Sequence, residues 1–266
     1  MKFAIQDGLF PIENEEKFFM QARDWGFDAV EVMGMRLEDR IDKIKSASRK
    51  SGLPVCAICP GLDGIRASLF EDDPQLREGI AKDIIKLLRH GAELGGAGLN
   101  VVPEFAKIKF MRLAPVYSNF EERKNIFLER IAPFAAEAEK LGVDILLEPL
   151  NRYEADFLLT VSQAAELCEA SGSPAMKILA DVFHMNIEDR DIPGELSRNI
   201  KHIAHVHFAD SNRHLPGRGH TDFAAAAAAL RNSGYTGYAS LECGVPGDPG
   251  IDVPESLAYL KKAAGA

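Results

Sequence analysis

Four residues that can bind a metal ion each follow a short apolar run with the character of a β-strand. The runs are Ile145–Leu147, Ile178–Ala180, Ala204–Val206 and Ala239–Leu241, and they lead into Glu148, Asp181, His207 and Glu242. The spacing is roughly 30 residues, the length of one βα unit. One polar residue at a strand end means little, because loops begin there. Four in successive units predict a site for one divalent metal, since three carboxylates and an imidazole suit a hard or borderline cation.

The elements that would position these residues alternate along the whole chain. We predict strands near 3–6, 28–32, 54–59, 98–102, 143–148, 177–182, 203–208 and 237–242. Helices are predicted at Glu15–Trp25, Leu37–Ser51, Pro74–Glu93, Phe120–Leu141, Ser162–Ala170, Pro193–Asn199, Phe223–Asn232 and Pro254–Ala264. Several of these helices are followed by a glycine, as is typical of helix C-termini. Eight alternating pairs predict a (β/α)8 TIM barrel, a single domain over residues 1–266, with the four residues at its carboxyl-end mouth.

Composition narrows the class of protein. The chain has 266 residues, 46% of them hydrophobic, a net charge of −9 and a pI near 5.3. An acidic chain argues against nucleic acid as a partner, because phosphate binding needs a basic face. The sequence contains no apolar run of the roughly 18 residues that a membrane helix needs, so no membrane partner is expected. The N-terminal residues lack the apolar core of a secretion signal, and we expect a cytoplasmic protein.

Cys56 and Cys59 have the C-x-x-C spacing that can indicate a redox pair or half a zinc site. They lie in a predicted buried strand, where residues three apart point to opposite faces. The sequence has no second C-x-x-C. We therefore interpret these cysteines as structural.

Other polar residues near the predicted mouth are weaker candidates. Glu31 ends the second predicted strand and is a candidate substrate-binding residue. His205 lies two residues before His207, on the same face and one layer deeper, so we interpret it as a buried supporting residue. Long loops at Pro60–Asp73 and Pro103–Asn119 follow the third and fourth strands. The second of these loops is a candidate apolar lid, with Phe105, Phe110, Met111 and Tyr117.

Three segments in the C-terminal half resemble a known family. Residues 148–154 read E-P-L-N-R-Y-E, residues 181–186 read D-V-F-H-M-N, and residues 205–213 read H-V-H-F-A-D-S-N-R. Over about 143–243 the chain resembles the ketose 3-epimerases of the tagatose/psicose type, within the xylose-isomerase-like TIM barrels. The resemblance implies that the metal ligands are Glu148, Asp181, His207 and Glu242. It further implies that Glu148 and Glu242 are the acid/base residues, and that Glu154, His184 and Arg213 hold the substrate near its carbonyl. A homo-oligomer, a dimer or tetramer, is also implied.

The chemistry expected of such a site follows from the acidity of a sugar carbon. A proton beside a carbonyl is weakly acidic, so its removal needs stabilisation of the enediolate that forms. A divalent cation on the carbonyl and hydroxyl oxygens supplies this stabilisation. Epimerisation then needs a base on each side of the flattened carbon. We expect a small-molecule sugar as the substrate and one divalent metal per chain, with Mn²⁺ first and Co²⁺ or Mg²⁺ as alternatives.

Several functions stay open at this point. An aldose–ketose isomerase of the hydroxypyruvate-isomerase type would share the barrel and the four metal-binding residues. An apurinic endonuclease would need further histidines on the third and fourth strands, which end instead on Cys59-Pro60 and Val102-Pro103. A non-catalytic sugar-binding protein is the remaining alternative. The sequence names neither the sugar nor the carbon that is inverted.

Overall fold

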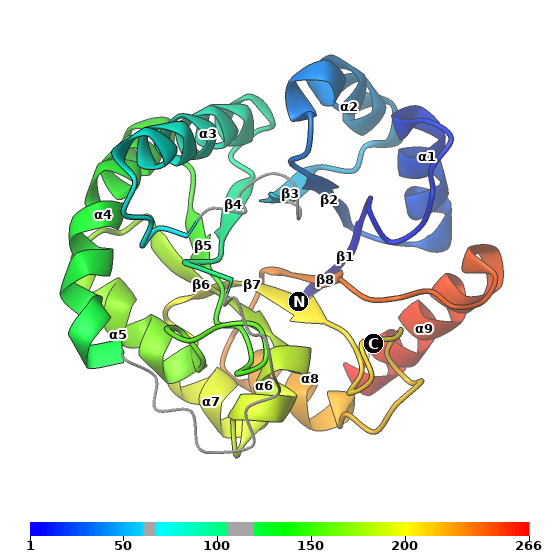
Figure 1. Cartoon of the computed structure of the whole chain (residues 1–266). Helices are drawn as coiled ribbons and strands as arrows, with labels where there is room; N and C mark the ends of the chain where they lie inside the picture. Colours follow the sequence, from blue (N-terminus) through cyan, green and yellow to red (C-terminus); the bar gives the residue numbers. More distant parts are fainter. Residues whose placement is uncertain (61–67, 106–119, 266) are drawn as a thin grey trace.

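The computed structural model describes residues 1–60, 68–105 and 120–265, and these form a closed barrel of eight parallel strands inside a ring of helices (Figure 1). The strands pair in sequence order, and β1 also pairs with β8. This confirms the predicted TIM barrel. The strands are β1 Lys2–Gln6, β2 Ala29–Met33, β3 Val55–Cys59, β4 Gly98–Val101, β5 Ile145–Leu147, β6 Met176–Asp181, β7 Ile203–Phe208 and β8 Tyr238–Leu241.

The helices agree with the predicted ranges, with two exceptions. They are α1 Glu15–Trp25, α2 Leu37–Ser51, α3 Pro74–Glu93, α4 Phe120–Leu141, α5 Val161–Ser171, α6 Val182–Glu188, α7 Ile192–Arg198, α8 Phe223–Asn232 and α9 Pro249–Ala263. The short helix α6 was not predicted. Helix α9 begins at Pro249 and not at Pro254, because the Asp248 side chain accepts a hydrogen bond from the Gly250 N–H and caps the earlier start.

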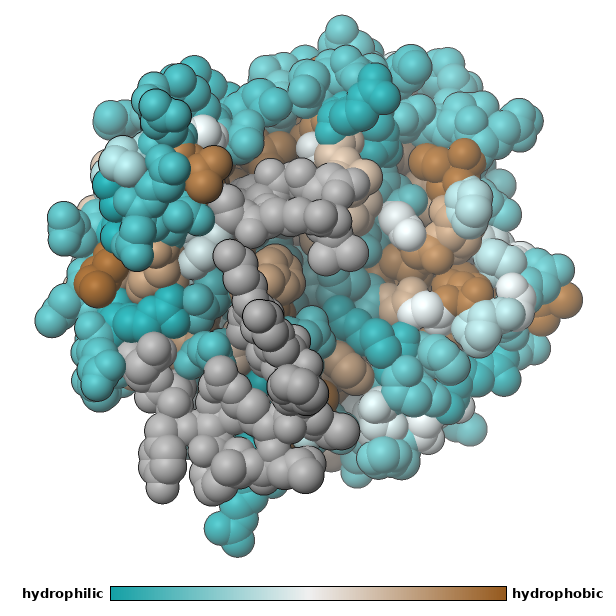
Figure 2. All heavy atoms as spheres, in the orientation of Figure 1, coloured by the Kyte–Doolittle hydropathy of each residue, from teal (hydrophilic) through white to brown (hydrophobic). Residues whose placement is uncertain are grey.

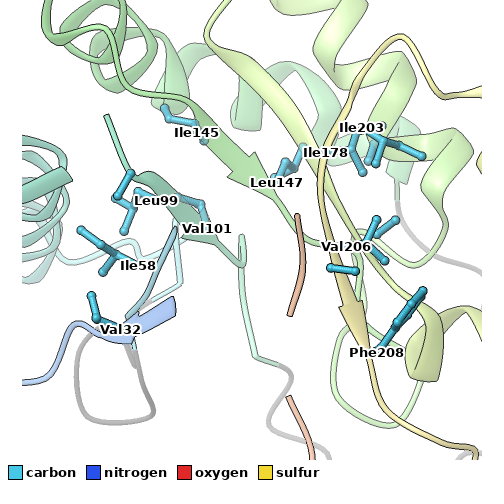
Figure 3. Packing of buried hydrophobic residues seen from close by; sticks show 14 of the residues in the cluster. Val32, Ile58, Leu99, Val101, Ile145, Leu147, Ile178, Ile203, Val206 and Phe208 are labelled. Atoms are coloured by element: carbon cyan, nitrogen blue, oxygen red, sulfur yellow. The ribbon is translucent and has the colours of Figure 1, made fainter. Parts of the chain in front are cut away.

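The main apolar core lies between the barrel and the helices that surround it. Figure 3 shows labelled side chains of this core on β2 to β7, including Ile58, Leu147 and Phe208, and all three are fully buried. The outward face of the helices is largely hydrophilic, as the teal atoms in Figure 2 show. Within the ranges that the structure describes, no helix combines the length and apolarity needed to cross a membrane.

The interior of the barrel differs from this core because its mouth end carries polar residues. A small apolar layer of Ala57, Leu146 and Leu179 fills the inner end. Toward the mouth, the next layer contains Gln6, Glu31, Asn100, His205 and Ser240, each exposing 6% or less of its surface. Buried polar groups need hydrogen-bond partners. The contacts among these residues are therefore central to how the site is built.

Two register shifts set which residues of β3 and β7 face inward. Val30 and Glu31 of β2 pair with Val55 and Ala57, which skips Cys56 on β3. On β7, the pairing with β6 passes from Ile203 to His205 and skips Ala204. Both skipped residues, Cys56 and Ala204, pack against the inner apolar layer. A β-bulge of this kind changes the phase of the inside–outside alternation, and it brings His205 and His207 to the interior.

The bulge in β3 corrects the reasoning applied to the two cysteines. Cys56 packs against the inner layer and Cys59 lines the cavity at the mouth, so both face the interior. The inference that they point to opposite faces was wrong, because the bulge puts Cys56 on the same face as Ala57, and Cys59 follows two residues after Ala57. Both are free thiols. Burial raises the pKa of the Cys56 thiol and of the Cys59 thiol well above the ordinary value, which suits the structural interpretation.

Most of the loops singled out as candidates lie outside the described residues. Residues 61–67 of the first loop and 106–119 of the second are among these, including Phe110, Met111 and Tyr117. The predicted apolar lid therefore stays a prediction. Phe105 is described, and it lines the cavity at the barrel mouth.

Candidate active site

The four predicted metal-binding residues come together at the carboxyl end of the barrel. Asp181 is the last residue of β6 and His207 lies in β7, while Glu148 and Glu242 directly follow β5 and β8. One ligand atom from each residue lies within 4.8 Å of the others. The strand ends thus place on one mouth four side chains that are far apart in the sequence.

His207 lies at the centre of this group. Its Nδ1 is 2.9 Å from Oε2 of Glu242, 3.6 Å from Oε1 of Glu148 and 3.9 Å from Oδ2 of Asp181. Its other ring nitrogen, Nε2, faces away from them and lies 3.1 Å from both carboxylate oxygens of Glu31. The imidazole therefore presents one nitrogen to the carboxylate cluster and the other to a buried support.

Two unpartnered atoms test whether the residues present fit a cation. Nδ1 of His207 and Oε1 of Glu148 are buried, and neither makes a hydrogen bond within the described part of the chain. Leaving such atoms unpaired costs about 1–3 kcal/mol each. A divalent ion bound to both would remove that cost, and three carboxylates with one imidazole suit Mn²⁺, Co²⁺ or Mg²⁺. The residues fit the implied metal, and they could hold it.

The pKa shifts of these groups show that the carboxylates of the cluster stabilise a positive charge among them. Burial alone would lower the pKa of His207, but the carboxylates of Glu31 and Glu242 hold it well above its ordinary value. Burial raises the pKa of Glu148, and the charge of Glu242 adds to the rise against the opposing contact with His207. At Glu242 burial also acts upward, but the positive charges of His207 and Arg213 outweigh it and lower its pKa.

Arg213 reaches back over the cluster from the loop after β7. Its Nη1 lies 2.5 Å from Oδ2 of Asp181, and its Nη2 contacts Oε2 of Glu242. The guanidinium also lies over the ring of Phe183, 4.7 Å from its centre. The structure thus brings Arg213 into contact with two of the predicted metal ligands.

The backbone of Arg213 adopts a left-handed conformation, with φ of 60°. For a residue other than glycine this costs about 1–2 kcal/mol. Two backbone hydrogen bonds hold it there, from Arg213 N–H to the Asp210 carbonyl at 2.8 Å and from Gly244 N–H to the Arg213 carbonyl at 2.7 Å. Backbone strain of this kind is typical of functional sites, and here it directs the guanidinium toward the metal-binding residues.

His184 is positioned by the short helix α6. Asp181 caps that helix by accepting from the N–H groups of Phe183 and His184. Nδ1 of His184 accepts a hydrogen bond from the backbone N–H of Asn151 at 3.1 Å. Because Nδ1 is an acceptor, the ring proton lies on Nε2 in the neutral imidazole. Nε2 is 3.7 Å from Oδ2 of Asp181, so the ring offers a donor to the site.

Glu154 lies at the edge of the site, on the loop after β5. Its Oε1 accepts from Nδ2 of Asn151 at 2.8 Å, and the side chain stays exposed. The predicted substrate-binding residues Glu154, His184 and Arg213 all line one cavity of about 260 Å³, together with Glu148 and Glu242. This is close to the lower end of the ~300–1,000 Å³ usual for ligand pockets. The cavity therefore suits a small ligand.

Sequence reasoning missed Asn100 and misjudged Glu31. Nδ2 of Asn100, in β4, donates to Oε2 of Glu148 at 2.7 Å and holds that carboxylate in place. Glu31 was a candidate for substrate binding, but it is fully buried beneath His207 and does not line the cavity. The inward alternation of β4 would have indicated Asn100. His205 is a buried support as predicted, with Nε2 3.0 Å from Oε2 of Glu31.

The fold and the site together define a xylose isomerase-like TIM barrel, and comparison with known proteins agrees. Residues 19–263 match the family described as "Xylose isomerase-like TIM barrel", and the chain belongs to that family. It is 32% identical to the 3-dehydro-D-guloside 4-epimerase of Escherichia coli (strain K12) over 98% of this chain and 99% of that protein. It is 28% identical to a probable ketose 3-epimerase of Synechocystis sp., over 91% of this chain and 84% of that one.

A solved structure shows the same relationship in three dimensions. The apo form of a 3-keto-D-glucoside 4-epimerase from E. coli superimposes with a TM-score of 0.89 at 30% identity, covering 98% of this chain and 99% of that one. A D-psicose 3-epimerase from Clostridium cellulolyticum H10 superimposes with a TM-score of 0.84, and its 21% identity supports the fold alone. The relatives named here are sugar epimerases, which are enzymes of the isomerase class.

Proposed function

We propose that this chain is a metal-dependent epimerase that inverts the carbon beside the carbonyl of a keto-sugar. The observation that carries the proposal is the position of Glu148 and Glu242. They follow strands on different sides of the barrel mouth, line one cavity, and have ligand atoms that lie close to His207. Proton removal from one face of a carbon and delivery to the other needs two such groups.

The metal-binding residues in this proposal are Glu148, Asp181, His207 and Glu242. A bound divalent cation would supply Lewis-acid stabilisation of negative charge on the substrate oxygens. The protein residues supply the rest. His184 donates from Nε2 to a substrate oxygen, and the Arg213 guanidinium lies where charge develops. Glu154 accepts from a sugar hydroxyl at the rim, while Asn100 keeps the Glu148 carboxylate oriented for proton transfer.

The substrate class favoured by the comparisons is a glycoside that carries a keto group at C3, inverted at C4. The support is the E. coli relative named as a 3-dehydro-D-guloside 4-epimerase, which matches this chain nearly end to end at 32% identity. A free ketose inverted at C3 is the alternative, from the more distant Synechocystis relative named as a probable ketose 3-epimerase. Both reactions use the same proton transfer beside a carbonyl.

Proton NMR in D₂O tests the proposal directly. The protein with Mn²⁺ is incubated with 3-keto-glycosides and, separately, with free ketoses. Deuterium should enter at the carbon beside the carbonyl, and the epimer should appear. Glu148→Gln and Glu242→Gln should each lower turnover by about 10²–10⁴-fold, while Glu129→Gln, at an exposed position of α4, should leave it unchanged. Near-normal turnover in both active-site variants would refute the assignment. Migration of the carbonyl would indicate an aldose–ketose isomerase instead.

Three further properties belong to the proposal. Mn²⁺ is the expected ion, and metal analysis of the purified protein, with Asp181→Ala and His207→Ala as variants, tests the ligand set. Full metal occupancy in both variants would contradict it. We expect a homo-oligomer, and light scattering would measure its mass in solution. We expect a cytoplasmic location, and cell fractionation would test it.

A further inference from the structure

The carboxylate of Glu31 forms the floor beneath the candidate metal site. Glu31 lies in β2, exposes 0% of its surface, and points into the barrel. Both of its oxygens lie 3.1 Å from Nε2 of His207, and Oε2 lies 3.0 Å from Nε2 of His205. Gln6 donates a hydrogen bond to Oε1 at 3.2 Å. Strands β1, β2 and β7 therefore meet at this one carboxylate.

These contacts determine where the imidazole protons lie. An ionised carboxylate can only accept hydrogen bonds, so Nε2 of each histidine must carry a proton to bind it. Three donors converge on the two oxygens of Glu31, Nε2 of His205, Nε2 of His207 and Nε2 of Gln6, as suits an ionised carboxylate. With one proton of His207 fixed on Nε2, Nδ1 is the nitrogen that faces Glu148, Asp181 and Glu242 and that can bind a metal ion in place of a proton.

The same three side chains could themselves hold a cation, since ligand atoms of Glu31, His205 and His207 lie within 4.8 Å of one another. Their separations of 3.0–3.1 Å are those of ordinary hydrogen bonds. Hydrogen bonds already satisfy both oxygens of Glu31, whereas Nδ1 of His207 has no hydrogen-bond partner in the described ranges. The hydrogen-bond geometry therefore favours a cation on the Nδ1 side of His207, and not between Glu31 and the two histidines.

We propose that Glu31 is a positioning residue that sets the tautomer and ring orientation of His207 and thereby builds the metal site, without touching metal or substrate. This inference rests on the proposed function, because it takes His207 as a metal ligand. Carboxylates that bind the second nitrogen of a metal-ligating histidine typically raise metal affinity 10–100-fold. The residue thus acts through His207 and from the layer below the cavity.

Glu31→Gln is the informative substitution, with Ser240→Ala as its matched control. A glutamine side chain keeps one acceptor oxygen and replaces the other with an NH₂ donor, so it cannot accept hydrogen bonds at both oxygen positions of Glu31. Its amide can instead donate to Nε2 of His207 and shift the ring proton to Nδ1, where it blocks a ligand. Oγ of Ser240 lies 2.8 Å from Nε2 of His205. Among the described residues, its hydroxyl makes no hydrogen bond with the side chain of His207. Removing its hydroxyl perturbs the same layer while the contact between Glu31 and His207 remains.

Two measurements on the full chain test the proposal. Calorimetric titration with Mn²⁺ should show about 10–100-fold weaker binding in Glu31→Gln and a change below about threefold in Ser240→Ala. Imidazole ¹⁵N NMR, with and without diamagnetic Mg²⁺, should show Nε2 of His207 protonated in the wild-type protein and the proton signal lost or moved in Glu31→Gln. A merely structural role would lower the unfolding temperature of Glu31→Gln and leave Mn²⁺ affinity unchanged.

The outcomes separate this inference from the proposed function. Equal Mn²⁺ affinity in wild type and Glu31→Gln would overturn the role of Glu31 and leave the metal-dependent function standing. A wild-type protein that bound no divalent metal would overturn the function. If Glu31→Gln did not fold, the wild-type NMR spectrum alone would decide, because an unprotonated Nε2 on His207 contradicts the proposal.

Discussion

Replacing Asp189 with asparagine should stabilise the protein above neutral pH. Asp189 ends helix α6, the helix that carries His184, and its N–H binds the Met185 carbonyl. Its Oδ2 is buried and makes no hydrogen bond with any residue that the structure describes. Burial raises the pKa of Asp189 from its ordinary 3.8 to about 7, and the negative charges of Glu195 and Glu188 add to the rise. The folded protein therefore resists ionisation of this carboxyl.

The sign and the size of the effect follow from that shift. A carboxyl whose pKa is raised on folding binds its proton more tightly in the folded state, so stability falls as the pH rises from about 4 to about 7 and is level above that. A rise from 3.8 to about 7 is worth about 4 kcal/mol at most. Because the side chain is only partly buried and can relax toward water, we expect about half, roughly 2 kcal/mol. For 266 residues this corresponds to about 4 °C in Tm.

Thermal unfolding of wild type and Asp189→Asn at several pH values from 4.5 to 8.5 is the assay. The advantage of the variant should grow with pH and reach a plateau above pH 7. The exposed Asp42, on α2, provides the control, and Asp42→Asn should show little dependence of its stability difference on pH. An advantage of Asp189→Asn that stayed the same from pH 4.5 to 8.5 would refute the reasoning, because the gain would then not come from the charge.

Three other predictions concern the site. Arg213→Lys keeps the charge but loses the two-pronged contact with Asp181 and Glu242, so turnover should fall about 10–100-fold. The Mn²⁺ affinity of this variant should stay near that of wild type. Unchanged turnover in steady-state kinetics would indicate that Arg213 has only a structural role. Asn100→Leu leaves Oε2 of Glu148 without its donor and should cost about 1–3 kcal/mol in the free energy of unfolding, together with at least tenfold in kcat. Urea titration and kinetics measure both, and an unaffected kcat would contradict the orienting role. Mn²⁺ at about 100 times its Kd should add about 2.7 kcal/mol to the free energy of unfolding, about 5 °C in Tm. Addition of EDTA should reverse the increase, and no shift would exclude tight binding to the folded state.

The barrel and the gathering of the predicted site residues at its mouth could be predicted because both depend on local patterns. Short apolar runs with polar ends mark parallel strands, and the carboxyl ends of such strands share one mouth. Glu148, Asp181, His207 and Glu242 therefore converge as the pattern indicated. Arg213 could not have been placed from the pattern alone. Its left-handed backbone is set by contacts with Asp210 and Gly244, and only the resemblance suggested its role.

Other features depended on contacts between distant segments. Helix α6 has seven residues, too short for a periodic pattern, and begins directly after β6 because the Asp181 side chain caps it. That residue was interpreted only as a metal ligand. Glu31 was placed at the mouth because it is near the end of its strand. Its actual depth follows from pairing with Gln6 on one side and Ala57 on the other, which no local pattern reveals.

The two bulges, at Cys56 and Ala204, have a consequence for any attempt to move this chemistry to another barrel. Each bulge acts on its strand as a frameshift acts on a coding sequence. Every residue after it faces the side opposite to the one that it would face in a regular strand. A regular β7 that kept Ala204 would contain the same site residues but turn His205 and His207 toward the helices, because Ile203 faces the outer core and the extra residue sets their phase. A graft that copies the sequence of this strand onto a barrel whose strand has no bulge would therefore transfer the composition of the site without its geometry.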